Sequence, residues 1–124
     1  MAQIILEFRL AQNKHEAIAE ICKRLGIQVI QVPRADYGQK LGALAGVAGF
    51  KKEKKVYSGP ELPAEMLVFS GMNSDQLDTF LAEYRACGLP AIGLKAVITA
   101  DNVFWNAESL FRELLDEHMK MPKR

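Results

Sequence analysis

The same order of hydrophobic patterns occurs twice along the chain, in residues 4–32 and in residues 66–98, and this repetition limits the possible folds more than any other feature. Each segment contains an apolar stretch, a helical pattern and a second apolar stretch. The residues expected to begin the two helices, Asn13 and Asn73, lie 60 positions apart. A regular spacing of this kind is typical of repeated structural units. We therefore predict two diverged strand–helix–strand–helix units related by duplication.

The first unit is expected to begin with a strand that is buried on one face only. Residues 4–10 alternate between apolar and polar side chains, so Glu7 falls on the face opposite the apolar one. Asn13 is expected to cap the helix that follows, and Gly26 is expected to end it. A second strand is expected at residues 27–32.

The second unit repeats this order, with strands expected at residues 66–69 and 92–98. Between them a helix is expected to start from an Asn73 cap. A last helix follows Asn106, another good N-cap residue. Near its end, His118 is expected to complement the helix dipole rather than to bind a ligand.

The helix expected to close the first unit carries glycine at every fourth position. Gly38, Gly42 and Gly46 would line one face of a helix over residues 37–49. Each glycine costs ~1 kcal/mol of helix propensity relative to alanine, so close packing against a sheet or a second subunit is expected to offset that cost. A phosphate-binding loop is the alternative, although the spacing matches no nucleotide-binding glycine motif.

Together these elements predict a single α/β domain, of the two-layer α+β type. A ferredoxin-like arrangement, in which two split units form an antiparallel sheet, is favoured. The alternative is a mostly parallel sheet with helices on both faces, which the strongly apolar second-unit strand supports. The expected parts are a first unit at 3–50, a linker at 51–64, a second unit at 65–119 and a tail at 120–124.

The composition is that of an ordinary globular domain. The 124 residues are 49% hydrophobic and 25% charged. Sixteen basic and fifteen acidic residues give a net charge of +1, which is too balanced to attract nucleic acid. No apolar stretch approaches the ~20 residues that span a bilayer, and the first ten residues lack a signal-peptide pattern. We therefore expect a cytoplasmic protein with neither a membrane nor a nucleic-acid partner.

The two cysteines, Cys22 and Cys87, are expected to be reduced thiols that pack as small hydrophobic residues. A disulfide, or a catalytic pair of one cysteine with His15 or His118, is the alternative. Neither cysteine belongs to a Cys-x-x-Cys pattern, and with two histidines in the chain a zinc site would need remote carboxylates. No metal and no cofactor are therefore expected.

Three motifs in the second unit resemble a known bacterial and archaeal family. They are Leu-Val-Phe-Ser-Gly at residues 67–71, Leu-Lys-Ala-Val-Ile-Thr at 94–99 followed by Asn102 and Trp105, and Leu-Leu-Asp-Glu-His at 114–118. Over residues 66–118 the chain resembles the family called domain of unknown function 3783. Because that family is uncharacterised, the resemblance implies a small cytoplasmic α/β domain and brings no activity, cofactor or catalytic residue.

The one place considered for a ligand site is where the two strands of the second unit end, beside the starts of the helices that follow. Six residues of this region could converge in one cleft: Ser70, Asn73, Lys95, Thr99, Asn102 and Trp105. Donor-rich helix ends favour an anionic or amide-bearing small molecule. The favoured interpretation, however, is that these side chains only complete turns and helix starts.

Three classes of function are open. The favoured one is a non-catalytic binding or regulatory module, expected to form a homodimer through an exposed sheet face or the glycine-lined helix. The second is a small enzyme, for which Lys95 with Asp101 is the candidate pair, since no Ser/His/Asp or Cys/His spacing occurs. The third is an RNA-binding sheet that stacks bases on Phe8 and Phe69, which the balanced charge disfavours.

Overall fold

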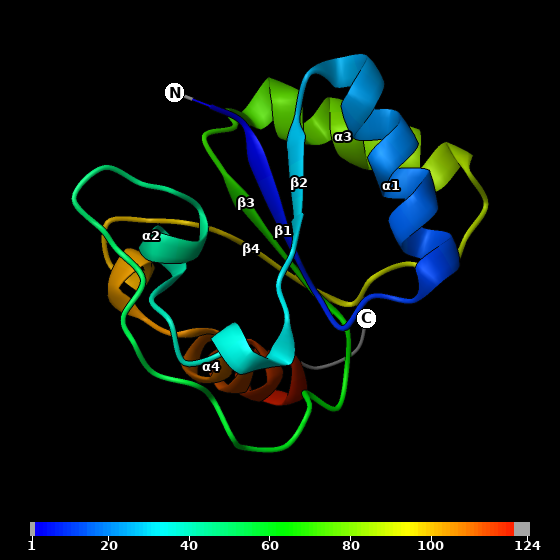
Figure 1. Ribbon diagram of the computed structural model, residues 1–124. Helices are drawn as coiled ribbons and strands as arrows, with labels where there is room; N and C mark the ends of the chain where they lie inside the picture. Colours follow the sequence, from blue (N-terminus) through cyan, green and yellow to red (C-terminus); the bar gives the residue numbers. More distant parts are fainter. Residues whose placement is uncertain (1, 121–124) are drawn as a thin grey trace.

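Two central strands form the middle of the sheet, and every residue in them is buried. β1 (Ile4–Phe8) runs antiparallel to β3 (Met66–Ser70). The edge strand β2 (Gln28–Gln31) is parallel to β1, and the edge strand β4 (Leu94–Val97) is parallel to β3, which gives the order β2-β1-β3-β4. Figure 1 shows this computed structural model, which describes residues 2–120. Of the tail expected at 120–124, residues 121–124 lie outside the described residues, as does the side chain of His118.

Helices cover both faces of this sheet (Figure 1). One face carries α1 (Gln12–Leu25) and α3 (Ser74–Ala86). The other face carries the short α2 (Leu41–Leu44) and the longer α4 (Ala107–Lys120). A 3-10 turn precedes each of these two, η1 (Arg34–Asp36) before α2 and η2 (Asn102–Phe104) before α4.

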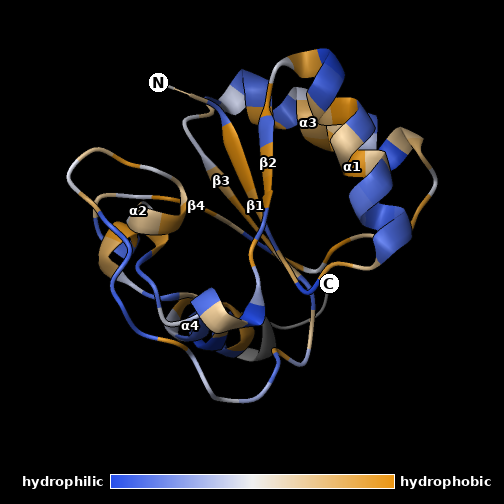
Figure 2. Ribbon diagram, in the orientation of Figure 1, coloured by the Kyte–Doolittle hydropathy of each residue, from blue (hydrophilic) through white to orange (hydrophobic). Residues whose placement is uncertain are grey.

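The alternation of side chains along β1 serves two hydrophobic cores rather than one. Leu6 and Phe8 pack with α2 and α4, whereas Ile5 packs with α1 and α3. In Figure 2 the strands are mostly hydrophobic, while α1 and α3 combine hydrophobic and hydrophilic residues. The expectation of a single buried face for β1 was therefore wrong, because α1 and α3 cover the second face.

The α/β class is confirmed, while the strand order differs from the favoured ferredoxin-like one. In that arrangement the two strands of each unit would be separated by a strand from the other unit. Here they pair directly and in parallel, with Ile5 beside Val29 and Leu67 beside Lys95. Strands that are apolar on both sides need helices on both faces, as the alternative arrangement supposed. That alternative differs in one respect, since the central pair is antiparallel. Descent of the two units from a duplication stays a prediction.

The two long helices of the α1–α3 face begin in different ways. The Asn73 cap of α3 is confirmed, since its side chain accepts from the Gln76 N–H and the Gln76 side chain accepts from the Asn73 N–H, both at 2.9 Å. The Asn13 cap of α1 was wrong: this helix starts two residues earlier, at Gln12, with Ala11 as N-cap. The carboxylate of Glu65 accepts from the Ala11 N–H at 2.8 Å and so takes part in binding the exposed donors there.

The glycine-rich segment forms one short helix instead of the long one that was expected. The helix contains only Leu41–Leu44, so Gly38 lies before it and Gly46, with φ 71°, follows it. Close packing holds for Gly42, where a Cβ atom would lie 2.7 Å from Val103 and 2.8 Å from Phe50. This contact is within the chain, and helices cover both sheet faces. Both surfaces expected to join two copies are thus engaged internally, and a homodimer stays a prediction.

Candidate functional site

The six residues of the expected site do not form one cluster, and most of them are held by hydrogen bonds within the fold. Ser70 is buried at the end of β3, and the Asn73 side chain caps α3. Lys95 donates from Nζ to the Ile92 carbonyl at 2.5 Å, at the start of β4 and away from Thr99. These hydrogen bonds explain the positions of Asn73 and Lys95 without a ligand.

Thr99 and Asn102 close a tight turn together. The Asn102 Oδ1 accepts from the Thr99 N–H at 2.8 Å, while the Thr99 hydroxyl accepts from the Asn102 N–H at 3.1 Å. The Asn102 amide also donates to the Val97 carbonyl at 3.0 Å. The side-chain oxygen and nitrogen of this buried residue are thus both engaged. This is the turn-forming interpretation that the sequence favoured.

Trp105 is joined to the turn by its backbone, since its N–H donates to the Asn102 carbonyl at 2.9 Å, but it lines a separate cavity. It lines a shallow cavity of about 430 Å³ with Phe104, Asn106, Ser109 and Glu113, none of which belongs to the expected set. Its side chain is partly exposed, and its carbonyl accepts from the Leu41 N–H at 2.8 Å. The structure therefore brings Thr99, Asn102 and the Trp105 backbone together, whereas the Lys95 ammonium is bound at the start of β4. Ligand binding by these residues stays a prediction.

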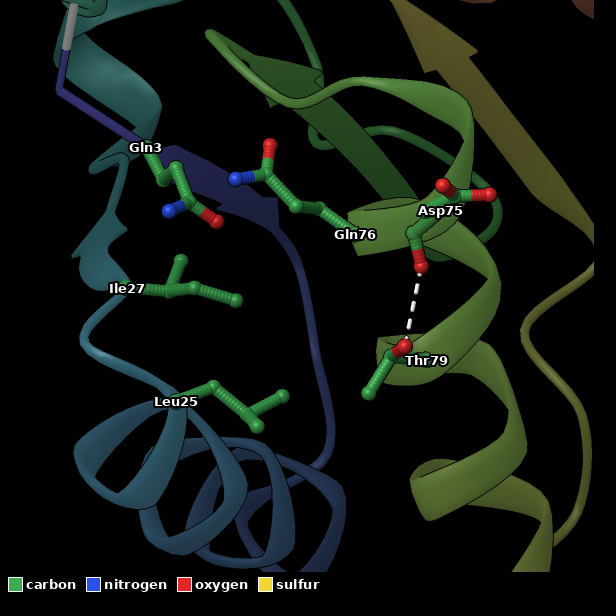
Figure 3. A pocket seen from close by; sticks show the side chains of 6 residues that line it. All are labelled: Gln3, Leu25, Ile27, Asp75, Gln76 and Thr79. Atoms are coloured by element: carbon green, nitrogen blue, oxygen red, sulfur yellow. Dashed lines mark hydrogen bonds between the residues drawn. The ribbon is translucent and has the colours of Figure 1, made fainter.

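A cavity of about 220 Å³ lies between α1 and α3, at the same end of the sheet as Asn73 (Figure 3). Leu25 and Ile27 form one wall, and Gln76 extends from α3 toward Gln3. Its polar groups are largely occupied, since Gln76 completes the cap of α3 and the Thr79 hydroxyl donates to the Asp75 carbonyl at 2.9 Å. This cavity therefore offers little that would fix a ligand.

The opposite end of the sheet holds a more polar cleft, which we call the β1–β2 cleft. It has a volume of about 230 Å³ and lies where β1 and β2 end. Its polar lining residues are Glu7, Arg9, Gln31, Arg34, Tyr37 and Glu61. The carboxyl ends of adjacent parallel strands are the usual place for ligands in open α/β sheets.

Glu7 is the buried charged residue of this cleft. Its side chain is 1% exposed, and its Oε1 lies 2.6 Å from Nδ1 of His15 on α1. Its Oε2 is buried and has no hydrogen-bond partner. Removal from water raises the pKa of this carboxyl above its usual 4.5, while the hydrogen bond and charge of His15 act in the opposite direction. A buried carboxylate oxygen without a partner is costly, so it calls for an explanation.

The sequence placed Glu7 on a solvent-facing side and so missed it. The alternating pattern of β1 correctly separates Glu7 from Leu6 and Phe8. It does not reveal that α1 and α3 cover the side with Glu7. A helpful signal was available in Ile5, an apolar residue on that same side, because a strand with one buried face would have placed a polar residue there.

Cys22 lies near Glu7 and is an unreactive thiol. Burial and the nearby Glu7 charge raise the pKa of Cys22 to about 12. Since the thiolate is the nucleophilic form, this cysteine stays protonated at neutral pH. Cys22 and Cys87 are both free in the structure, and Cys87 is exposed.

Tyr37 and Glu61 form the opposite wall of the cleft. Tyr37 is buried, and its hydroxyl donates to Glu61 Oε1 at 2.5 Å. The same carboxylate oxygen accepts from the Leu62 N–H at 2.8 Å. Burial, followed by the hydrogen bond and charge of Glu61, raises the pKa of the Tyr37 hydroxyl. This wall is therefore already internally hydrogen-bonded, with a neutral phenol beside an accepting carboxylate.

Two arginines on the cleft differ in how they are engaged. Arg34 donates from Nε and Nη2 to the Gly59 carbonyl, at 2.9 and 2.5 Å. Arg9 follows β1 with φ 59°, a left-handed backbone conformation that few residues other than glycine adopt. Its exposed guanidinium forms no hydrogen bond or ion pair with the part of the chain that the structure describes. Arg9 is thus available to a ligand.

Residues 65–121 match the model of the family described as Domain of unknown function (DUF3783), which confirms the resemblance stated from the sequence. No curated protein and no solved structure matches the chain. The match covers the β3–β4 half of the sheet, whereas every residue that lines the β1–β2 cleft precedes residue 65. The cleft therefore belongs to the part of the chain outside the family match.

Within residues 2–120, no three His, Cys, Asp or Glu side chains that the structure describes are grouped as a metal site would require. Within the same residues, none of the helices has the length and apolar character needed to cross a bilayer.

Proposed function

We propose that the chain is a non-catalytic binding or regulatory module and that its small ligand occupies the β1–β2 cleft. The observation that carries this proposal is Oε2 of Glu7, which is buried and has no hydrogen-bond partner. Glu7 lines a cleft that is also lined by the available Arg9. Buried polar atoms in proteins nearly always have partners, and exceptions are concentrated where a ligand or water completes the set. A donor on a ligand would supply the missing hydrogen bond.

The size of the cleft limits the ligand. The cleft has a volume of about 230 Å³ and is open to solvent. Pockets for drug-sized molecules start at about 300 Å³. A nucleotide or dinucleotide is therefore too large to be enclosed, and the cleft suits a metabolite of a few non-hydrogen atoms.

The chemistry of the cleft favours binding over catalysis. The Tyr37 hydroxyl stays protonated and donates a hydrogen bond to Glu61, and the neighbouring Cys22 is a protonated thiol. The residues that line the cleft include no Ser, Thr or Cys. Glu7 and His15 resemble the base and orienting group of a catalytic set, but such a set also needs a nucleophile or a substrate proton to act on.

A thermal-shift screen of wild-type protein and Glu7→Gln tests this proposal. The screen uses small carboxylates, amines, phosphate esters and amino acids. A ligand present at a hundred times its Kd adds ~2.7 kcal/mol to the stability, which raises the Tm of a domain of this size by several degrees. We expect at least one class to stabilise the wild type and not Glu7→Gln.

The ligand-free stability of Glu7→Gln gives a second readout. Because an ionised carboxylate is costly to bury, the neutral amide is expected to leave the ligand-free protein equally stable or more stable at pH 7. A variant that is less stable and still responds to every ligand of the wild type would show that Glu7 has only a structural role. Glu65→Gln is the matched control, since it removes a carboxylate outside the cleft lining.

A further inference from the structure

We propose that the ligand of the β1–β2 cleft is a small zwitterion of the α-amino acid class, with its ammonium group on Glu7 and its carboxylate on Arg9. This inference rests on the proposed function, because it names the kind of molecule that the same cleft would bind.

The cleft has one charged residue of each sign with a hydrogen-bonding position still open, although the other carboxylate oxygen of Glu7 is bound by His15. Oε2 of Glu7 has no partner, and the guanidinium of Arg9 makes no hydrogen bond or ion pair with the described residues. The other two charged groups are already engaged. Arg34 donates to the Gly59 carbonyl, and Glu61 accepts from Tyr37 and from the Leu62 N–H.

The balance of charges disfavours ligands of a single sign. A dianion entering the cleft would meet the carboxylates of Glu7 and Glu61, and a dication would meet Arg9 and Arg34. Like charges brought within a few ångströms in a partly buried site repel, and this repulsion excludes wrong partners. A molecule that carries both charges, a few bonds apart, can pair with Oε2 of Glu7 and with the guanidinium of Arg9 and leave no like charges facing each other.

The remaining lining residues suit the side chain of an amino acid. Leu10, Val32 and Pro33 add apolar surface between the polar groups. The volume of about 230 Å³ accommodates a single amino acid and excludes an enclosed peptide. A small or medium-sized apolar side chain could lie against these three residues while the two charged groups are held.

The test measures binding of the twenty common amino acids to the wild-type protein by calorimetry, at concentrations up to about 10 mM. For the tightest binder, two analogues with the same side chain follow. The 2-hydroxy acid lacks the ammonium group, and the primary amine lacks the carboxylate. We expect each analogue to bind at least tenfold more weakly than the amino acid, since a charge-assisted hydrogen bond is lost in each case.

Two variants assign the two charged groups to their partners. Glu7→Gln is expected to weaken the amino acid at least tenfold and to affect the 2-hydroxy acid much less. Arg9→Gly removes the guanidinium at a backbone conformation that suits glycine, and it is expected to weaken the amino acid while affecting the amine much less. Arg24→Ala is the control for Arg9, because it removes another exposed arginine, from α1, outside the cleft lining.

The outcomes separate this inference from the proposed function. If no amino acid binds, or if the hydroxy acid and the amine bind as tightly as the amino acid, the zwitterion assignment is overturned. If a probe of another charge class then binds in a way that depends on Glu7, the cleft is a ligand site with a different ligand. If no class of probe depends on Glu7, the proposed function fails as well. Arg9 lies on the exposed rim, so its variant reports on the inference even if Glu7→Gln does not fold.

Discussion

The two ends of the sheet differ in how their polar side chains are used, although both are the carboxyl ends of a parallel strand pair. At the end of β3 and β4, Thr99 and Asn102 satisfy each other and the neighbouring backbone. At the end of β1 and β2, the buried Oε2 of Glu7 and the guanidinium of Arg9 are left without partners in the described chain. Polar residues at strand ends are thus not in themselves a site. What distinguishes a candidate site is whether its donors and acceptors are already engaged.

The largest effect is expected from Gly42→Leu, which tests whether the β3–β4 end is structural. A side chain here would clash with Val103 of η2 and with Phe50. Overpacking of this severity is expected to cost about 3 kcal/mol or more and to lower the urea midpoint sharply. In Gly38→Leu, where the added Cβ lies 3.9 Å from its neighbours, the loss is expected to be much smaller. Equal stability of Gly42→Leu and wild type would contradict the packing of α2 against η2.

Asn102→Ala is expected to have the next largest effect. It removes the side-chain hydrogen bonds to the Thr99 N–H and the Val97 carbonyl, at 2.8 and 3.0 Å. Leaving these groups partly buried and unpaired is expected to cost about 2 kcal/mol in the free energy of unfolding. Asp101→Ala, at the exposed neighbouring position, should change it by less than about 0.5 kcal/mol. A stable Asn102→Ala variant that loses ligand binding would restore the site predicted from the sequence.

Glu7 and Glu65 are expected to give opposite pH dependences. The pKa of Glu7 is raised by burial, so its contribution to stability is present below pH 4.5 and is lost as the pH rises through the folded-state pKa. Burial also acts to raise the pKa of Glu65, but hydrogen bonds from Lys14 and Ala11 outweigh it and lower that pKa. Its contribution is therefore present above pH 4.5 and is lost as the pH falls through the folded-state pKa.

Urea unfolding of Glu7→Gln and Glu65→Gln between pH 3.5 and pH 8 measures this difference. Relative to wild type, Glu7→Gln should gain stability as the pH rises, whereas Glu65→Gln should lose about 1–2 kcal/mol above pH 5 and little below it. The same sign of pH dependence for both variants would show that burial does not determine the pKa of Glu7.

The smallest effect on the free energy of unfolding is expected at the helix starts, where α3 and α1 can be compared. Asn73→Ala removes one hydrogen bond of a capping box and should cost ~1 kcal/mol in unfolding free energy. Asn13→Ala should cost less than about 0.5 kcal/mol, since Ala11 and not Asn13 is the N-cap of α1. A large loss from Asn13→Ala would contradict the helix start described for α1.

The elements that the sequence predicted well depend on local signals. The Asn73 capping box, the left-handed Gly26 at the end of α1 and the Asn106 cap of α4 each involve residues a few positions apart. Each can therefore be recognised from a short stretch of chain.

The features that the sequence did not reveal depend on contacts between distant residues. The start of α1 involves Glu65, and the burial of Glu7 requires α1 and α3 to cover one face of the sheet. The short α2 ends at Ala45, where the left-handed Gly46 follows, although the spacing of its glycines suggested a long helix. The cleft itself combines residues of the first strand pair with Glu61, more than fifty positions after Glu7.

The most direct measurement of the central claim is the map of backbone amide shifts in a two-dimensional NMR spectrum during titration with the best amino-acid ligand. The account predicts saturable shifts for the amides of Arg9, Gln31 and Arg34 around the β1–β2 cleft, and none of comparable size for Thr99 and Asn102. Shifts confined to residues 97–106 would contradict it and would place the ligand at the other end of the sheet.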